Sequence, residues 1–348
     1  MTESSMRVAV VRTGELRIET RARPEPAAGE ALVRLRACGI CGTDLHFHSA
    51  GFWPEGHVPG HEMFGEVEAL GEGVTGLSPG DPVAIEPISA CGRCDLCRAG
   101  RANVCPDTKL FGIHLPGGFA EAISVPAERL FPVPRDLDPA LAALAEPMAV
   151  AIHGLRRGQL APGQRVLVIG AGTIGLLCVA AARAAGAGEV WLTARHPHQQ
   201  ELGRALGATR VLGEPEATPT ALAGSSREAP IDLCIETVGG SADTLHTAAA
   251  AIRSGGTIAV LGVFMGDVAV PALPLLVKEG TLTWSNCYER RGGGADFADA
   301  IALLAAERSS LSSLTTRSVA LDEIERGLAL ANDKRAGAVK VTVRCDGG

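Results

Sequence analysis

The sequence predicts an α/β protein that combines an irregular β domain of barrel type with a doubly wound parallel sheet. Three observations predict this fold class. Residues 1–130 are rich in Gly and Pro and carry short β-branched runs, whereas apolar strands alternate with helical patterns after Pro139. At about 150 residues per domain, the 348 residues also suggest two domains.

The first region contains short strands between turns. Residues 31–36 and 81–85 are the clearest of these strands, and the turn signal Ser78-Pro79-Gly80 precedes the second one. An Ala- and Leu-rich segment at residues 139–158 then predicts a helix.

The second region alternates strands with helices, which is typical of βαβ units. We expect its strands at residues 165–169, 190–193, 233–237 and 257–261. A helix near 295–307 and a final strand at 339–343 return to the mixed character of the first region. We therefore expect one domain of residues 1–150 with 284–348, and a second domain of residues 151–283.

Composition excludes several classes of protein. With 32 basic and 39 acidic side chains the net charge is −7, which does not favour a nucleic-acid partner. Hydrophobic residues reach 46% and mean hydropathy is +0.19, as in globular proteins. The opening residues lack a leader pattern, and the apolar segment 166–182 is interrupted by glycines and shorter than the roughly 20 residues of a membrane span. We expect a cytoplasmic protein that is not bound to a membrane.

Four of the ten cysteines form a closely spaced set. Cys91, Cys94, Cys97 and Cys105 lie on a segment whose Gly92 and Gly100 favour tight turns. Four thiolates complete the tetrahedral shell of a structural zinc ion and leave no position for a substrate. Four unrelated buried thiols would not be spaced so evenly, and a nucleic-acid-binding zinc ribbon would need a basic footprint that is missing here.

A second metal site is expected upstream. A catalytic zinc needs about three protein ligands and one open position. Cys41 and His61 are the best candidates, and Glu62 or Glu146 could supply the third ligand. Alternatively, Cys41 is a small buried side chain or pairs with Cys38, although the thioredoxin-like βαβ pattern of redox CxxC motifs is missing.

A glycine-rich turn joins the strand at 165–169 to a helix. Gly170, Gly172 and Gly175, with Thr173 and Ile174 between them, have the spacing that lets a pyrophosphate approach the backbone at a helix N-terminus. Because a strand precedes this turn and a helix follows it, we predict a dinucleotide site.

The end of the next strand bears on the choice of cofactor. Ala194 stands where a carboxylate would bind the ribose 2′-hydroxyl of NAD, and Arg195 and His196 follow it. A guanidinium without a carboxylate suits a 2′-phosphate, so we predict NADP(H). If Arg195 is only a solvated surface residue, discrimination between the two cofactors would be poor. Val238 and Leu261, at the ends of later strands, are the remaining expected cofactor contacts.

The order of these motifs resembles the zinc-dependent medium-chain alcohol dehydrogenases over essentially the whole chain. The resemblance is closest to the branch of sorbitol and threonine dehydrogenases, because Glu146 stands where simple alcohol dehydrogenases carry a cysteine ligand. It implies a GroES-like catalytic domain with an inserted Rossmann domain. It further implies one catalytic and one structural zinc, a small-molecule alcohol or carbonyl substrate, and a homodimer or homotetramer joined near residues 273–284.

The resemblance also implies roles for single residues. Cys41, His61 and either Glu62 or Glu146 match the catalytic zinc ligands, and Asp44 matches the carboxylate that orients the ligand histidine. Thr43 and His46 match a relay that carries the alcohol proton to solvent. The candidate substrate contacts, each equally explicable as core packing, are Phe47, Phe52, Trp53, Phe111, His114, Asn286 and Tyr288.

The expected activity is interconversion of an alcohol, secondary or polyol- and sugar-like, with its ketone or aldehyde by hydride transfer. A zinc-free enoyl or quinone reductase would share the glycine-rich turn but not the cysteine motifs. A methyltransferase would have no use for an open metal site, and a non-catalytic zinc protein would not need Thr43 and His46.

Overall fold

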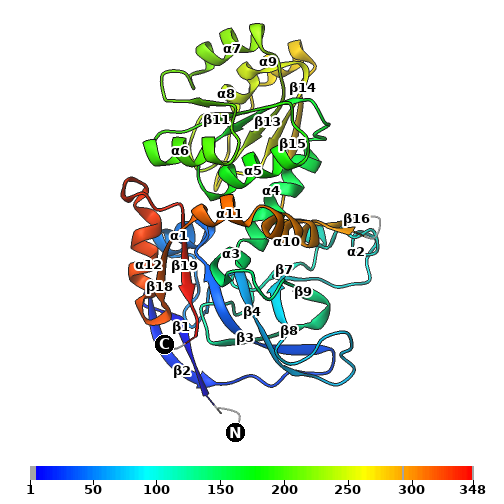
Figure 1. Cartoon of the computed structure of the whole chain (residues 1–348), viewed down its shortest axis with the longest axis vertical. Coiled ribbons are helices and arrows are strands. Elements are labelled where there is room, and N and C mark those ends of the chain that lie inside the picture. Colours follow the sequence, from blue (N-terminus) through cyan, green and yellow to red (C-terminus); the bar gives the residue numbers. More distant parts are fainter. Residues whose placement is uncertain (1–4, 292–293, 347–348) are drawn as a thin grey trace. The chain divides into compact units, whose positions relative to one another are not determined.

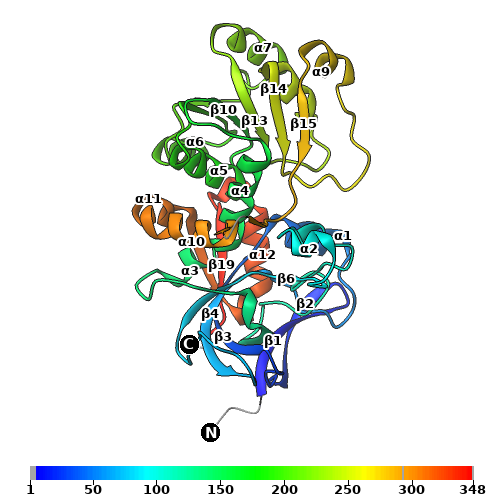
Figure 2. The same cartoon turned by 90° about the vertical axis from the view of Figure 1, so that its right-hand side faces the viewer.

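The computed structural model describes residues 5–291 and 294–346. It divides into two compact units, Met1–Glu146 with Glu289–Gly348 and Pro147–Tyr288. The first unit is therefore discontinuous, and its junctions lie within a few residues of the expected positions 150 and 284. Figures 1 and 2 show the elements of each unit in two views.

The first unit is built on a seven-stranded, mainly antiparallel sheet in which only β18 and β19 pair in parallel. The order is β18-β19-β3-β4-β5-β9, and β8 also pairs with β3. The strands are β3 (Glu30–Gly39), β4 (Glu62–Leu70), β5 (Pro82–Ile85), β8 (Ala122–Pro126), β9 (Leu130–Pro132), β18 (Thr315–Ala320) and β19 (Lys340–Arg344). An N-terminal hairpin joins β1 (Ser5–Arg12) to β2 (Glu15–Ala22).

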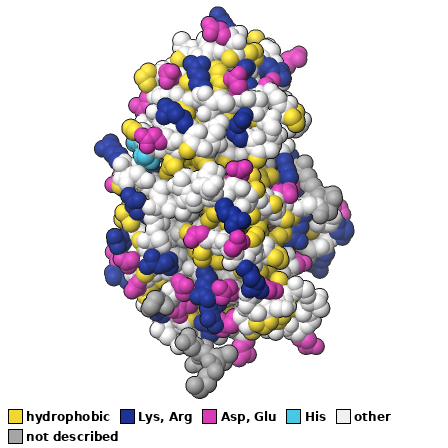
Figure 3. Space-filling model, in the orientation of Figure 1, with side chains coloured by type: hydrophobic (Ala, Val, Ile, Leu, Met, Phe, Trp, Pro, Cys, Tyr) yellow, Lys and Arg dark blue, Asp and Glu magenta, His cyan; other side chains and the backbone are white. Residues whose placement is uncertain are grey.

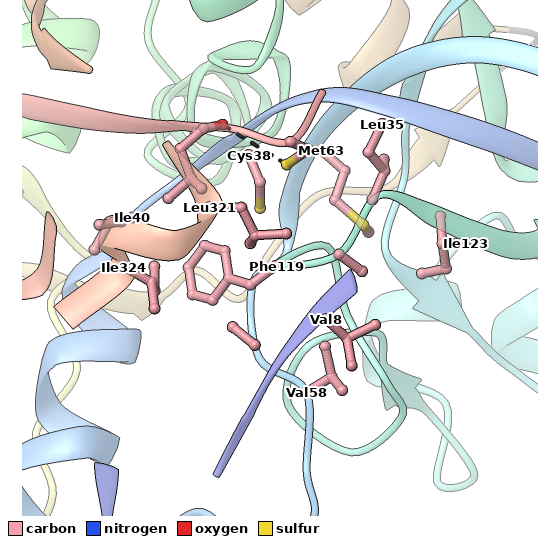
Figure 4. Close-up of a cluster of buried hydrophobic side chains, with 14 of the residues drawn as sticks. Val8, Leu35, Cys38, Ile40, Val58, Met63, Phe119, Ile123, Leu321 and Ile324 are labelled. Atoms are coloured by element: carbon pink, nitrogen blue, oxygen red, sulfur yellow. Dashed lines mark hydrogen bonds between the residues drawn. The ribbon is translucent and has the colours of Figure 1, made fainter. Parts of the chain in front are cut away.

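The core of this unit is a cluster of aliphatic and aromatic side chains from the two sequence segments that form it. Figure 4 shows Leu35 of β3 and Met63 of β4 around Phe119, together with Leu321 and Ile324 from the C-terminal part of the chain. Burying these side chains stabilises the unit through the hydrophobic effect. The C-terminal segment therefore completes the core that the first strands begin.

Shorter elements surround this sheet. The two-stranded pairs are β6 (Ile88–Ser89) with β7 (Lys109–Leu110) and β16 (Arg290–Arg291) with β17 (Gly294–Ala295). The helices are α1 (Gly42–Ala50), α2 (Asp95–Arg98), α3 (Pro139–Ala142), α10 (Asp296–Ala306), α11 (Arg308–Leu311) and α12 (Ile324–Asn332). The 3₁₀ turns are η1 (Ala102–Val104), η2 (Ala127–Arg129), η3 (Ser312–Leu314), η4 (Leu321–Glu323) and η5 (Lys334–Ala336).

The second unit is a six-stranded parallel sheet in the order β12-β11-β10-β13-β14-β15. Its strands are β10 (Arg165–Ile169), β11 (Glu189–Thr193), β12 (Arg210–Leu212), β13 (Ile231–Glu236), β14 (Ile252–Val260) and β15 (Thr281–Trp284). Its helices are α4 (Ala145–Arg157, which begins at the junction), α5 (Thr173–Ala184), α6 (Pro197–Ala205), α7 (Pro219–Glu228), α8 (Thr244–Ala251) and α9 (Ala272–Lys278). Helix α5 packs on β10 and β11, whereas α8 packs on β13 and β14.

The strand order places a topological switch point between β10 and β13. From β10 the chain first builds outward through β11 and β12, and it then returns to add β13, β14 and β15 on the other side. In such sheets ligands bind outside the carboxyl ends of the strands at the switch point. The predicted fold class is confirmed, and the sequence analysis missed only short strands such as β12 and β15 in this sheet.

No helix among the described residues is both long and apolar enough to span a bilayer. On the face drawn in Figure 3, basic and acidic side chains are intermixed.

Candidate functional site

The four predicted cysteines meet in one lobe of the first unit, residues 91–105. Cys94 caps α2 and accepts a hydrogen bond from the backbone N–H of Cys97 at 3.5 Å. Sγ–Sγ distances are 3.9 Å between Cys91 and Cys97, 3.7 Å between Cys94 and Cys105, and 3.6 Å between Cys105 and Cys91. Zinc–sulfur bonds of about 2.3 Å in a tetrahedron place sulfurs about 3.8 Å apart, so the lobe fits a zinc ion.

The backbone of the lobe prepares its sulfurs for a cation. Hydrogen bonds from the backbone N–H groups of Arg93 and Cys94 lower the pKa of the Cys91 thiol to about 6. Burial and the hydrogen bond with Cys94 raise the pKa of Cys97 to about 12. Four thiolates cannot coexist at these distances without a positive charge, and a divalent metal supplies one.

A second cluster forms from Cys41, His61 and Glu62. Their ligand atoms all lie within 4.8 Å of one another, and His61 and Glu62 are buried. Cys41 is the N-cap of α1, whereas Glu62 is the first residue of β4 and His61 directly precedes it. A thiolate, an imidazole and a carboxylate are zinc ligands that leave a fourth position open. The donor set therefore fits a catalytic zinc ion.

Two glycines make this cluster possible. Gly60 adopts φ +94°, a left-handed conformation, immediately before His61. A Cβ atom on Gly39 would lie 1.9 Å from the Glu62 carboxylate, so glycine at this position of β3 leaves space for that side chain.

Asp44 lies beside the cluster and is itself buried. Its carboxylate accepts a hydrogen bond from the backbone N–H of Cys41 at 2.9 Å, and its other oxygen lies 3.7 Å from His61 Nδ1. Although burial opposes it, the charges of Asp44 and Cys41 raise the pKa of His61 well above its usual value. Asp44 is thus placed to orient the imidazole, as a carboxylate behind a metal-binding histidine does.

Glu62 has a partner that the sequence analysis did not foresee. Lys340 of β19 donates hydrogen bonds to both carboxylate oxygens of Glu62 at 2.6 Å and to the carbonyl of Ile40 at 3.0 Å. Both charged side chains are fully buried. Although burial opposes it, Glu62 raises the pKa of Lys340 and keeps the ammonium charged.

Glu146, the other predicted third ligand, is buried in the first turn of α4 but is not part of the three-residue cluster. Burial and the nearby Glu62 raise its pKa to about 7, although His61 opposes the shift. The structure thus places Glu62 with Cys41 and His61 and leaves Glu146 behind them as a second buried carboxyl group.

The proposed relay residues lie on one helix. Thr43 is half-buried and His46 is exposed, and they are three residues apart on the same face of α1. Most aromatic substrate candidates of this unit pack internally. Trp53 belongs to the core cluster, Phe111 and Phe47 pack against it, and Phe47 makes an edge-to-face contact with the exposed Phe52.

The remaining substrate candidates are scattered in exposure. Tyr288 is fully buried, whereas Asn286 and His114 are exposed, and His114 Nδ1 accepts a hydrogen bond from the backbone of Leu110. Their side chains do not define a substrate pocket within either unit.

The glycine-rich turn has the geometry expected of a pyrophosphate loop. Gly170 adopts φ +102°, Gly172 is the N-cap of α5, and a Cβ atom on Gly175 would lie 1.9 Å from the Gly170 carbonyl oxygen. The first turn of α5, with Thr173 and Ile174, therefore starts directly behind the loop. The positive end of the helix dipole at this N-terminus favours an anionic ligand.

At the end of β11 the structure shows no carboxylate where NAD-binding proteins carry one. Ala194 is buried, and its carbonyl accepts a hydrogen bond from Gln200. Arg195 is exposed and lies 3.4 Å from Glu214, and His196 begins α6 as its N-cap. Val238 is partly exposed after β13, and Leu261 follows β14 in the same sheet.

Two family models match the chain. Residues 27–135 match the alcohol dehydrogenase GroES-like domain, and residues 173–306 match the zinc-binding dehydrogenase domain. The chain is 33% identical to a sorbitol dehydrogenase of Bacillus subtilis over 82% of this chain and 84% of that one. It is 36% identical to an L-galactonate-5-dehydrogenase of Escherichia coli over 84% of each chain.

A solved structure shares the whole fold. A zinc-binding dehydrogenase from Sinorhizobium meliloti, bound to NADP, superposes with a TM-score of 0.85 at 32% identity, over 98% of this chain and 100% of that one. The fold and the sites define an oxidoreductase that acts on alcohols. This chain belongs to the zinc-dependent medium-chain alcohol dehydrogenase family.

Proposed function

We propose that this enzyme interconverts a secondary alcohol of polyol or sugar-like type and its ketone, with NADP(H) as the hydride carrier. The observation that carries the proposal is the cluster of Cys41 with the buried His61 and Glu62. The similar proteins named for sorbitol and L-galactonate support a polyhydroxylated substrate.

The cluster offers three ligands for the metal that this chemistry needs. Cys41, His61 and Glu62 would hold a zinc ion, which would supply a Lewis acid that lowers the pKa of an alcohol and stabilises negative charge on its oxygen. Asp44 orients His61, and Lys340 fixes Glu62.

Helix α1 provides the route for the proton. The half-buried hydroxyl of Thr43 would take the alcohol proton, and the exposed imidazole of His46 would pass it to water. The second unit holds the hydride carrier at its glycine-rich turn.

A substrate screen tests the reaction. Polyols and sugar acids with NADP⁺, and ketoses with NADPH, are offered to the zinc-loaded enzyme while nicotinamide absorbance is followed. Turnover of a secondary alcohol that disappears in Thr43→Val supports the proposal. Turnover of primary alcohols alone, or of none of these classes, contradicts it.

The preference for NADP(H) is supported by Ala194 and Arg195, because a guanidinium binds a phosphate and position 194 carries no carboxylate. We expect Arg195→Ala to weaken NADPH binding about tenfold and to leave NADH binding nearly unchanged. Arg204→Ala, at an exposed position of α6, the helix that follows Arg195, is the matched control. Tighter binding of NADH than NADPH by the unaltered enzyme contradicts the preference.

The enzyme is further proposed to pair with a second copy of itself at the edge strand β15. Among the described residues no strand pairs with the outer edge of β15, and the nearby side chains Leu273, Leu276, Val277 and Trp284 are exposed. An open edge beside exposed apolar side chains is a pairing surface. Light scattering of the unaltered enzyme should give a dimer or tetramer, and Leu276→Glu should shift it toward the monomer. A monomeric unaltered enzyme contradicts this proposal.

A further inference from the structure

A fully buried carboxylate lies at the carboxyl end of β13. Glu236 has no exposed surface, and one of its oxygens, Oε1, accepts three hydrogen bonds. The donors are the backbone N–H of Val238 at 2.8 Å, the backbone N–H of Gly239 at 3.0 Å and the hydroxyl of Thr244 at 2.8 Å. A carboxylate that binds the backbone of its own loop fixes the path of that loop.

The same residue also holds the loop after β14. The backbone carbonyl of Glu236 accepts hydrogen bonds from Leu261 at 2.8 Å and from Gly262 at 3.1 Å. Glycine is required at 262, because a Cβ atom there would lie 2.4 Å from Glu236 Oε2. Through its carbonyl and its side chain, Glu236 thus joins two loops of the same sheet edge.

These two loops also contact each other directly. The backbone N–H of Gly240 donates to the carbonyl of Val263 at 2.8 Å, and a Cβ atom on Gly239 would lie 2.5 Å from the backbone of Val263. Val238 and Val263 present exposed apolar side chains on this rim, 42% and 51% exposed. We call the residues 237–240 and 261–263 the second rim.

The second rim is tied to the pyrophosphate loop. The hydroxyl of Thr237 donates to the carbonyl of Ile169 at 2.8 Å and lies 3.3 Å from that of Gly170. The rim thus begins at the switch point and extends over β13 and β14, away from β11. Since the adenosine end of a dinucleotide lies at the end of β11, the rim faces the other half of the cofactor.

We infer that Glu236 is a positioning residue that holds the second rim in the shape that receives the nicotinamide half of the cofactor. This inference rests on the proposed function only in requiring a nicotinamide cofactor, and it holds for NADP(H) or NAD(H). Because Glu236 draws the N–H groups of Val238 and Gly239 inward, the rim offers the cofactor the side chains of Val238 and Val263.

The binding of NADPH, compared with the binding of 2′,5′-ADP, tests this role. Glu236→Ala should weaken NADPH binding about tenfold, since the rim loses the acceptor of two backbone N–H groups. Binding of 2′,5′-ADP, which lacks the nicotinamide half, should change by less than about twofold. Glu236→Gln keeps an oxygen acceptor and should stay within about threefold of the unaltered enzyme for both ligands. NADH and ADP replace this ligand pair if the enzyme prefers NAD(H).

Asp232→Ala is the matched control. Asp232 is a carboxylate at the opposite end of the same strand, and it accepts hydrogen bonds from the backbone N–H of Arg165 at 2.8 Å and from Arg253 at 2.7 Å. Asp232→Ala should lower the melting temperature. It should not weaken the binding of NADPH more than the binding of 2′,5′-ADP. If Glu236→Ala does not fold, Glu236→Asp, whose shorter side chain cannot reach both N–H groups, should show the same selective loss at smaller size.

Equal weakening of NADPH and 2′,5′-ADP, or no weakening of either, overturns the inference. Failure of the proposed reaction gives a different result. An enzyme that oxidises no alcohol but loses NADPH selectively in Glu236→Ala contradicts the proposed substrate and supports the role of Glu236.

Discussion

The two candidate metal sites of the first unit are assembled in opposite ways. The four-cysteine lobe uses residues 91–105 only, and its sulfurs are partly exposed, except for the buried Cys105. The Cys41 cluster joins α1, β4 and β19, and it is largely buried. A local, closed site stabilises one segment of chain, whereas a site collected from distant elements can keep an open position inside a rigid frame.

The charges around the two sites differ as well. The lobe relies on backbone N–H groups to stabilise its thiolates. The Cys41 cluster has charged side chains behind its ligands, with Asp44 beside His61 and Lys340 against Glu62. Such partners hold the ligands in one orientation and tune the metal that the ligands bind.

The largest expected effect follows from removing a ligand of the open site. Cys41→Ala should lower turnover at least about a thousandfold, because the Lewis acid contributes several kcal/mol to the barrier. The zinc content should fall from two ions to one per chain, with the lobe still loaded. Cys38→Ala, a buried cysteine outside both clusters, is the control and should keep both ions. An active Cys41→Ala enzyme would show that this cluster is not catalytic.

Removing a ligand of the closed site should affect stability instead. Cys97→Ala should cost about 4–5 kcal/mol of unfolding free energy, as expected when a structural metal is lost. Turnover of the folded fraction should stay within about threefold, because a site closed by four thiolates has no open position for a substrate. Denaturant titration and zinc analysis of the same sample measure both effects. If turnover collapses while zinc is still bound at the Cys41 cluster, the lobe takes part in catalysis.

The sequence predicts the four-cysteine lobe more completely than it predicts the Cys41 cluster. Cys91, Cys94, Cys97 and Cys105 lie within a short segment, so their spacing alone predicts that the sulfurs meet. The glycine-rich turn could be predicted for the same reason, since strand, loop and helix are contiguous. Lys340 was missed because it lies 278 residues from Glu62, and nothing near it in the sequence indicates that partner.

The sequence alone does not distinguish side chains that pack in the core from side chains that contact the substrate. Trp53 and Phe111 were substrate candidates, and the structure packs them in or against the core. Glu236 was unremarked, because a glutamate at the end of a strand usually extends into water. Only the fold shows that the next loops close over it. Strand β12 is three residues long, too short for a periodic pattern.

Breaking the ion pair between Lys340 and Glu62 should have a smaller effect on stability, and this effect should depend on the metal. Lys340→Met leaves a buried carboxylate unpaired, which should cost the zinc-free protein about 3 kcal/mol of unfolding free energy. Zinc restores a positive charge beside Glu62, so the zinc-loaded variant should recover part of this loss. The rise in melting temperature on adding zinc should therefore be larger in Lys340→Met than in the unaltered enzyme. An equal rise would mean that Lys340 and the metal do not share Glu62, and Lys340→Arg should behave like the unaltered enzyme.

The smallest expected effect concerns the carboxylate behind His61. Asp44→Asn keeps an oxygen that can accept the N–H of Cys41, but it removes the negative charge 3.7 Å from the imidazole. Loss of such a partner should weaken zinc binding at the Cys41 cluster about tenfold. A chelator titration measures both sites in one molecule, and the lobe, which lacks a comparable carboxylate, serves as the internal control. Only the ion at the Cys41 cluster should leave at a lower chelator concentration than in the unaltered enzyme. If both ions leave at lower chelator concentrations, the substitution has destabilised the whole unit. The proposed difference between the Cys41 cluster and the four-cysteine lobe is then wrong.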